Sequence, residues 1–300
     1  MQMINQTLKV FVTVIDKKSF TLAAESLHMT QPAVSNYIRK LEEELGLTLI
    51  DRSGKLVRLN PAGEIYYHYA KEMIGIDERM QHLIQDLQNE SKGPVHIGAS
   101  YTYGEYILPK IIAQLVGKYP RIKPKVSISN SSSIIRMVNS HDLDIGIIED
   151  EERETDKDLN ITRLIKDRMY IVGNHDTPDS LDNKALGSAT WIVREDGSGT
   201  RSYQDQLFTS LGISPETITL SSTQAVKSSV TNGLGLTLLS HHTIGEELKT
   251  GSLKIINRES TELSRYFHLL TPDVKFHSKS TRTLVDMFNE DSIETHHFKS

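Results

Sequence analysis

The chain has 300 residues and a formal net charge of −5, with 37% hydrophobic and 24% charged residues and no cysteine. This composition is ordinary for a globular protein and argues against collagen-like and disordered classes, while the lack of cysteine excludes disulfides, thiolate metal sites and cysteine nucleophiles. No segment approaches the roughly 18 consecutive apolar residues of a membrane helix, and the first residues lack the pattern of a signal peptide, so we expect a cytoplasmic protein of two or three domains.

The charge is distributed unevenly along the chain. Residues 1–60 contain eight Lys and Arg against six Asp and Glu, a balance of +2, so the remainder carries −7. A mildly basic head on an acidic body is typical of a nucleic-acid-binding module joined to a second unit.

Apolar residues spaced three or four apart predict three helices in the head, over residues 4–16, 21–27 and 31–45. Ser19 or Thr21 can cap the second helix and Thr30 the third, whose first turn holds Pro32, where a missing backbone N–H costs nothing. The third helix leaves one face polar near its N-terminal end, with Gln31, Pro32, Ser35, Asn36 and Arg39.

This pair of helices, joined by a tight turn, resembles a helix-turn-helix, in which the second helix presents polar N-terminal residues to the major groove of DNA. We therefore interpret the third helix as a recognition helix. A solvated helix face is the alternative, and it is the interpretation we adopt for residues 42–44, three glutamates whose carboxylates would repel phosphate.

A wing is predicted after the third helix. Ser53-Gly54 forms a turn, and residues 55–59 alternate in polarity as a hairpin strand does. Arg52, Lys55 and Arg58 would lie on this wing.

A long helix is predicted next, because Asn60-Pro61 provides a cap and a first-turn proline and no strong breaker follows until Gly93-Pro94. Its apolar residues repeat with a period close to 3.5, which suits a two-stranded seam; they are Ile65, Tyr69, Met73, Ile76, Met80, Leu83 and Leu87. A dimer would present two recognition helices to half-sites about 34 Å apart, or a multiple of that. The alternative is a helix that lies on its own C-terminal domain.

From Pro94 onward, short apolar runs alternate with helical segments and predict two α/β lobes. The first would contain strands at 95–99, 125–129 and 143–148 with helices at 105–118 and 133–139. The second would contain strands at 168–172, 190–193, 217–220 and 234–239 with helices at 200–211 and 223–232.

Hydroxyl-rich segments follow four of these strands, and each precedes a helix. Open α/β sheets bind ligands beyond the C-terminal ends of their strands, and helix N-termini favour anions. The segments supply a predicted anion site of Ser100, Thr102, Ser131, Ser132, Arg194, Gly197, Ser198, Gly199, Thr200, Arg201, Thr223 and Gln224. The alternative for each Ser and Thr alone is an ordinary helix cap. The glycine-rich run 194–201 lacks the Gly-Lys-Ser/Thr ending of a nucleotide P-loop, so we reject ATP hydrolysis.

Motifs that would indicate an enzyme are absent from the sequence. The twelve histidines form no His-Glu-x-x-His or comparable metal spacing, and there is no Gly-x-Ser-x-Gly elbow. We interpret the acidic run 149–158 as a solvated loop and predict no metal site, no cofactor and no catalytic residue. A small-molecule-binding enzyme with an appended DNA-binding head remains an alternative, and a purely architectural DNA protein would leave some 200 residues without a role.

Residues 19–52, from Ser-Phe-Thr-Leu-Ala-Ala to Leu-Ile-Asp-Arg, closely resemble the DNA-binding signature of LysR-type transcription regulators. Residues 91–290 resemble the effector domain of that family, which is similar to a type 2 periplasmic binding protein, with matching stretches at 143–147 and 230–240. The run 194–201 looks most like the branch that controls sulfur assimilation and carbon fixation.

The resemblance implies a winged helix-turn-helix at residues 1–60, a dimerising linker helix at 61–92 and a two-lobed effector domain at 93–300. The first lobe would comprise about 93–161 and 267–300, and the second about 162–266. The DNA-binding residues that it implies, together with those placed near the groove by the helix pattern, are Thr30, Gln31, Pro32, Ser35, Asn36, Arg39, Arg52 and Lys55.

Two residues depart from the family pattern, which usually has a basic residue where Asn36 stands and Phe where Ile50 stands. Asn can pair with adenine, whereas Arg would favour guanine, so the first departure changes the expected base preference.

The function implied is regulation of metabolic genes in response to a small anionic effector. The partners implied are double-stranded promoter DNA, the effector, a homodimer or homotetramer of the chain, and RNA polymerase. A regulator with no small-molecule effector is the alternative within the class.

Overall fold

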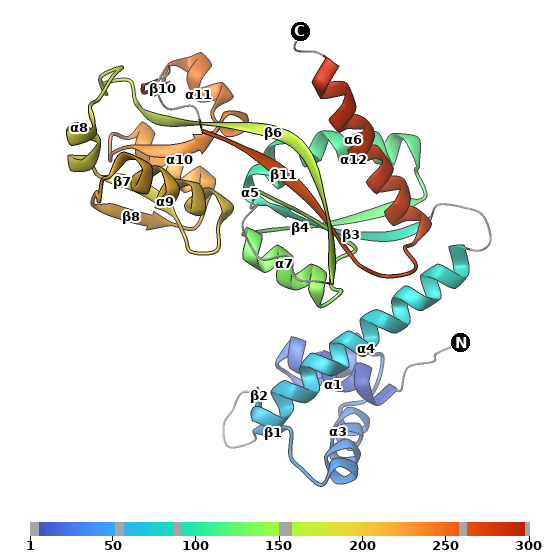
Figure 1. The fold of residues 1–300 in the computed structure, drawn as a ribbon. Helices are drawn as coiled ribbons and strands as arrows, with labels where there is room; N and C mark the ends of the chain where they lie inside the picture. Colours follow the sequence, from blue (N-terminus) through green and yellow to red (C-terminus); the bar gives the residue numbers. More distant parts are fainter. Residues whose placement is uncertain (1–5, 52–56, 87–91, 150–157, 258–262, 298–300) are drawn as a thin grey trace. The chain divides into compact units, whose positions relative to one another are not determined.

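The computed structural model describes residues 6–51, 57–86, 92–149, 158–257 and 263–297. The chain forms two compact units, residues 1–88 and 89–300, which are described separately below (Figure 1). None of the helices within the described ranges is both long and apolar enough to cross a membrane.

The first unit begins with three helices that pack around one small core. They are α1 (Gln6–Lys17), α2 (Phe20–Ser26) and α3 (Gln31–Leu45). The core includes Phe11, Val34 and Ile38, which are fully buried. The hydroxyl of Ser19 accepts a hydrogen bond from the backbone N–H of Leu22 and caps α2, so of the two candidate caps the structure selects Ser19.

The wing follows α3 as a two-stranded antiparallel ladder of β1 (Ile50–Asp51) and β2 (Arg58–Leu59). Arg58 lies on the second of these strands, as predicted. Arg52 and Lys55, the other two residues predicted on the wing, lie outside the described residues.

A 26-residue helix, α4 (Pro61–Asp86), ends the described part of the first unit. Its start is fixed by Asn60, whose Oδ1 accepts a hydrogen bond of 2.8 Å from the backbone N–H of Gly63. Four residues of the predicted seam are more than half exposed on this helix, and they are Ile65, Tyr69, Met73 and Ile76.

The second unit contains two lobes that share a curled seven-stranded sheet of order β10-β6-β11-β5-β3-β4, with β9 also paired to β6. The first lobe comprises β3 (Gly93–Ser100), α5 (Tyr101–Tyr106), α6 (Leu108–Lys118), β4 (Ile122–Ser129), α7 (Ser131–Asn139), β5 (Ile145–Ile148) and α12 (Lys279–His297). Strand β3 lies between β4 and β5 and is parallel to both, so the C-terminal ends of all three strands meet at one edge.

The second lobe packs around Met169, Trp191 and Leu238, which are fully buried. It comprises α8 (Asn183–Ser188), β7 (Trp191–Arg194), α9 (Gly199–Leu211), β8 (Thr217–Leu220), α10 (Thr223–Thr231), β9 (Thr237–Ser240), η1 (His241–Thr243), α11 (Gly245–Thr250) and β10 (Leu253–Ile255). Strands β7 and β8 are parallel.

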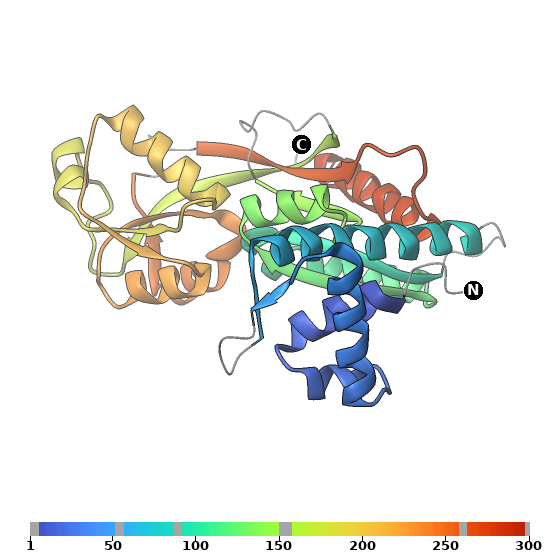
Figure 2. The same cartoon turned by 90° about the horizontal axis from the view of Figure 1, so that it is seen from below.

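Two long strands, β6 (Leu159–Asn174) and β11 (Leu263–Pro272), join the lobes as an antiparallel pair. Near its start β6 pairs with the end of β11, which also pairs with β5 of the first lobe, and near its own end β6 pairs with β9 and β10 of the second. Both strands pass from one lobe to the other, as Figure 2 shows.

The prediction of one helix over residues 105–118 was wrong, because the structure has two helices that separate at Ile107. Pro109 lies in the first turn of the second helix and has no backbone N–H to continue the first.

Candidate functional sites

The predicted recognition helix α3 presents an exposed polar surface organised by its own side chains. Gln31 Nε2 donates a hydrogen bond of 3.0 Å to Ser35 Oγ, and Arg39 Nη2 donates one of 2.7 Å to Asn36 Oδ1. Arg39 also pairs with Glu43 at 2.6 Å, but both side chains are 58% exposed. An ion pair this exposed contributes little to stability, so the guanidinium can exchange Glu43 for a phosphate or a base at small cost.

Thr30 has a structural role in the same helix. Its hydroxyl accepts a hydrogen bond of 3.4 Å from the backbone N–H of Ala33 and caps α3. Pro32 follows within the first turn, exposed beside Gln31. The cap therefore fixes where the helix begins and with it the positions of the polar side chains of the first turn.

In the second unit, the predicted anion-site residues gather where the two lobes meet. The backbone N–H of Ser132 donates a hydrogen bond of 3.1 Å to the carbonyl oxygen of Gly197 in the opposite lobe. A Cβ at Gly199 would lie 3.0 Å from Glu149 Oε2 and 3.1 Å from Ser131 Oγ, so the start of α9 approaches the first lobe as closely as a glycine allows. Most of the predicted side chains are buried, namely Ser100, Thr102, Ser131, Arg194, Ser198, Thr200 and Thr223.

Two of the four strand ends behave as ordinary helix caps and two do not. Asn130 caps α7 and Ser222 caps α10 through their side chains. Ser100 and Ser198 precede α5 and α9 without making a side-chain cap hydrogen bond. Ser100 Oγ is moreover buried with no hydrogen-bond partner among the described residues. A buried hydroxyl without a partner is costly, so the Ser100 hydroxyl would gain from a hydrogen bond to a ligand.

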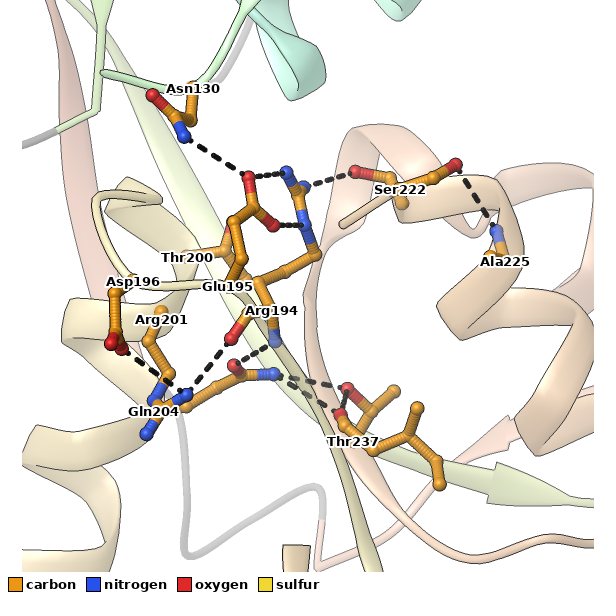
Figure 3. Close-up of polar contacts among 12 residues, drawn as sticks. Asn130, Arg194, Glu195, Asp196, Thr200, Arg201, Gln204, Ser222, Ala225 and Thr237 are labelled. Carbon is orange, nitrogen blue, oxygen red and sulfur yellow. Dashed lines mark hydrogen bonds and ion pairs between the residues drawn. The ribbon is translucent and has the colours of Figure 1, made fainter. Parts of the chain in front are cut away.

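Arg194 is a buried cation at the end of β7 in the second lobe (Figure 3). Its Nε and Nη2 donate hydrogen bonds of 2.8 and 3.0 Å to the two carboxylate oxygens of Glu195, and its Nη1 donates one of 2.8 Å to Thr223 Oγ1. The guanidinium also stacks 4.7 Å from the ring centroid of Tyr101 in the first lobe. The sequence pattern identified Arg194 and Thr223, but it did not identify Glu195 as their neighbour.

Arg265 is a second buried cation, which sequence reasoning missed because it lies in a strand without a motif. Its Nε donates a hydrogen bond of 2.8 Å to Asp167, its register partner on β6. Its Nη1 and Nη2 donate to the hydroxyls of Thr200, at 3.2 Å, and Thr102, at 3.4 Å, which belong to different lobes. Arg265 therefore lies at the junction of the lobes.

Glu149 is buried at the same junction, so its assignment to a solvated acidic loop was wrong. It is 2% exposed, accepts a hydrogen bond of 3.1 Å from Ser131 Oγ and lies 3.8 Å from Arg265. The remainder of that acidic run, up to residue 157, lies outside the described residues. Glu149 directly follows the buried strand β5, and this position was the signal for its burial.

Two of the predicted residues, Arg201 and Gln224, do not share these contacts between the lobes. Arg201 pairs with Asp205 at 2.9 Å and donates a hydrogen bond of 3.0 Å to the carbonyl oxygen of Arg194, while Gln224 is exposed on α10. Gln204, which was not predicted, is fully buried and accepts a hydrogen bond of 3.0 Å from the backbone N–H of Arg194. It thereby fixes the end of β7 against α9 (Figure 3).

A third buried cation, Lys227, lies on α10, one turn after Thr223. It donates hydrogen bonds to Glu247, at 2.6 Å, and to the carbonyl oxygen of Thr243, at 2.8 Å, and lies 5.2 Å from the ring of Tyr106. Burial lowers the pKa of Lys227, but the hydrogen bonds with Glu247 and Tyr106 outweigh it, so the pKa is raised overall. Lys227 is thus charged and fully engaged.

No group of His, Asp and Glu in the part of the chain that the structure describes is arranged to hold a metal ion.

A winged helix-turn-helix joined to a two-lobed α/β unit, with polar side chains where the lobes meet, defines a DNA-binding transcription regulator of the kind that responds to small molecules. Residues 5–64 match the model of the bacterial regulatory helix-turn-helix protein of the lysR family, and residues 88–292 match the LysR substrate binding domain. The chain therefore belongs to the LysR family of transcription regulators, and it is not an enzyme.

Relatives of the chain include the HTH-type transcriptional regulator CysL of Bacillus subtilis (strain 168), 34% identical over 285 residues that cover 93% of this chain and 95% of CysL. The RuBisCO operon transcriptional regulator of Allochromatium vinosum is 30% identical over 88% of each chain. These relatives confirm the predicted branch.

Among solved structures, the Synechocystis CcmR regulatory domain in complex with 2-phosphoglycolate covers 67% of this chain and 98% of its own, at a TM-score of 0.62 and 24% identity. The full-length CbnR bound to its target DNA superposes with a TM-score of 0.72 at 14% identity, over 95% of this chain and 98% of its own.

Proposed function

We propose that this LysR-family regulator binds a small anion where the two lobes of its second unit meet, and that Ser100, Ser131, Ser198 and Arg194 contact it. The observation that carries the proposal is that two hydrogen-bonding groups where the lobes meet, the Ser100 hydroxyl and the N-terminus of α9, lack the partners expected of them. Within the described ranges Ser100 Oγ is buried without a partner, and the start of α9 has no side-chain cap from Ser198.

An anion suits these groups because each offers hydrogen-bond donors. The first backbone N–H groups of a helix have no partner within the helix, and the helix dipole adds partial positive charge there. The hydroxyl of Ser100 can turn toward an anion, that of Ser131 can do so by leaving Glu149, and Arg194 supplies a full positive charge. The CcmR regulatory domain, which shares this fold, was solved with 2-phosphoglycolate, itself an anion.

The DNA partner is proposed to be a palindromic promoter site, read by α3 and the wing of two copies of the chain. A dimer through α4 would bury the exposed apolar residues Ile65, Tyr69, Met73 and Ile76. We expect two such dimers to form a tetramer, to act with RNA polymerase and to reside in the cytoplasm, where promoter DNA is found. Effector binding would close the lobes, and the assembly would pass the change to the DNA-binding units as a shift in their spacing and in DNA bending.

A footprinting experiment tests this function. The full chain should protect a palindromic promoter fragment, and one small anion from a thermal-shift screen should both stabilise the protein and alter the footprint. Protection of random DNA to the same degree would contradict the DNA assignment. A footprint that no anion alters would favour a regulator without a small-molecule effector.

The site itself is tested with Ser100→Ala. We expect the anion found in the screen to bind about tenfold more weakly, because one hydrogen bond to a charged group is lost, while DNA affinity is unchanged. Ser210→Ala makes the same chemical change at the opposite end of α9 and should leave anion binding unaltered. Equal affinities for all three proteins would refute the site.

A further inference from the structure

Glu195 lies in the position where an anionic ligand of Arg194 would be expected. Its two oxygens receive hydrogen bonds of 2.8 and 3.0 Å from the guanidinium in a bidentate arrangement (Figure 3). This is the geometry with which arginine binds a free carboxylate or a phosphate. With Thr223 on the third nitrogen, at 2.8 Å, each of the three nitrogens of Arg194 donates a hydrogen bond to the protein itself.

The same carboxylate also connects the lobes. Asn130 Nδ2, at the start of α7 in the first lobe, lies 3.4 Å from Glu195 Oε1 as a hydrogen-bond donor. Two residues after Glu195, the carbonyl oxygen of Gly197 accepts the backbone hydrogen bond from Ser132. The segment that holds Glu195 is therefore part of the contact between the lobes.

The balance of buried charge makes this arrangement unfavourable for a further anion. Two guanidinium groups, Arg194 and Arg265, face three carboxylates, Glu149, Asp167 and Glu195, so these five side chains carry one net negative charge. An anion that entered with all three carboxylates in place would raise the uncompensated negative charge in a region of low dielectric, which is costly.

Only one of the three carboxylates has a short route to water. The side chain of Glu195 is 21% exposed, whereas those of Glu149 and Asp167 are 3% and 0% exposed. The next residue, Asp196, is 96% exposed, so the loop that holds Glu195 already borders solvent. Moving the Glu195 carboxylate into water restores most of its hydration, while the other two would have to leave the core.

On the basis of the proposed anion site, we infer that Glu195 is a built-in competitor whose carboxylate occupies Arg194 and is displaced into solvent when the effector binds. The competitor also selects the class of effector. A monocarboxylate would replace one carboxylate on Arg194 with another and gain little. A sulfate or phosphoryl group has further acceptor oxygens, which can accept hydrogen bonds from the surrounding hydroxyls as well as from Arg194, so it can displace Glu195.

Calorimetric titration of the full-length protein at fixed ionic strength and pH 8 tests this inference, with sulfate, inorganic phosphate and acetate as probes. Glu195→Gln keeps the shape of the side chain and removes its charge, so sulfate and phosphate should bind about tenfold more tightly and acetate should gain measurable binding. Asp196→Asn removes the same charge one residue away, from a carboxylate that is 96% exposed and lies 3.6 Å from Arg201 rather than on Arg194, and it should match the wild type.

A second variant keeps the test decisive if Glu195→Gln is too unstable to study, since its buried guanidinium loses a charged partner. Glu195→Asp retains the charge but is shorter by one methylene, and it should weaken the bidentate contact and give an intermediate gain in sulfate affinity. Melting curves without probe verify that each variant is folded.

The outcomes separate the competitor from the anion site. If the wild type binds sulfate or phosphate and Glu195→Gln binds them equally or more weakly, the competitor is overturned and the site stands. An equal gain in sulfate and phosphate affinity in Asp196→Asn would mean that overall charge alone explains the effect, and it would also overturn the role of Glu195 as a competitor. If no variant binds any probe, both the anion site and the competitor are overturned.

Discussion

Two buried serines at strand ends, Ser100 on β3 and Ser240 on β9, illustrate how differently one residue type can be used. Ser240 Oγ donates a hydrogen bond of 2.7 Å to Asp167, whereas Ser100 Oγ has no partner among the described residues. The hydroxyl of Ser240 stabilises the fold. The hydroxyl of Ser100 lowers the stability of the free protein, and a hydrogen bond to a bound ligand would recover that free energy.

Alanine substitution should separate these two uses. Ser100→Ala should leave the stability of the second unit unchanged or slightly raised, because no hydrogen bond is lost. Ser240→Ala should cost about 1–3 kcal/mol, because Asp167 keeps its buried charge and loses a donor. Urea unfolding followed by tryptophan fluorescence measures both, since Trp191 is buried in that unit. A loss of similar size in the two variants would mean that Ser100 also has a structural partner.

Residues on α3 should divide into those that read bases and those that hold the fold. Ser35→Ala should weaken binding to a specific site by about 1–3 kcal/mol and leave binding to random duplex nearly unchanged, because base contacts carry specificity and phosphate contacts do not. Fluorescence anisotropy with both duplexes over a range of salt measures the two affinities. Equal losses on both duplexes would place Ser35 outside the base-reading surface.

At the residue scale, the sequence predicts the roles of side chains whose partners lie a few positions away in the chain. Caps such as Ser19 and Thr30 depend on neighbours three residues away, and the structure has both. The partners of Arg265 could not be predicted, because Asp167 and Thr102 are separated from it by 98 and 163 residues. Glu195 was missed for another reason: two adjacent residues usually point apart, and here a side chain folds back onto its neighbour.

Among the elements, α4 approaches the wing so closely that only glycine fits at Gly63. A Cβ there would lie 2.1 Å from the carbonyl oxygen of Leu49. Gly63→Ala should therefore force α4 away from the wing, lower the melting temperature of the first unit and abolish DNA binding, while anion binding by the second unit persists. Calorimetry and the anisotropy assay measure these effects.

Gly117 on α6 provides the matched control, because a Cβ there would meet nothing within 4 Å. Gly117→Ala should stabilise the second unit by about 0.5–1 kcal/mol through helix propensity. Intact DNA binding by Gly63→Ala would show that the approach of α4 to the wing has no bearing on recognition.

Elements were predicted best where one period of hydrophobicity runs through them. Helix α3 has the predicted bounds, because its cap, its proline and the glycine after Leu45 all agree. Only the end of the 16-residue strand β6 was predicted, as residues 168–172, since its first half is largely exposed and shows no apolar run. Strand β11 was missed as an element, although it pairs with β6 along nearly its whole length.

At the scale of the whole molecule, the exposed apolar face of α4 is the surface through which we propose that two copies of the chain form a dimer. Met73→Lys places a charge in the middle of this face and should dissociate the proposed dimer, because a lysine there would be buried against a second copy. Light scattering after size exclusion measures the mass. Glu78→Lys, which introduces the same side chain at an exposed position outside the predicted seam, should retain the wild-type mass. An unchanged mass for Met73→Lys would contradict a dimer through this face.

The ion pair between Arg265 and Asp167 has a consequence for motion between the lobes. Both residues belong to the strands that the lobes share, and they are direct partners in the ladder. Opening the lobes would therefore break the hydrogen bonds that the Arg265 guanidinium donates to Thr102 or Thr200 and leave Arg265 paired with Asp167. At Arg265 the energetic cost of opening is then the loss of a hydrogen bond to a hydroxyl and not the loss of the partner of a buried ion, which helps to keep both conformations within reach of a weakly binding metabolite.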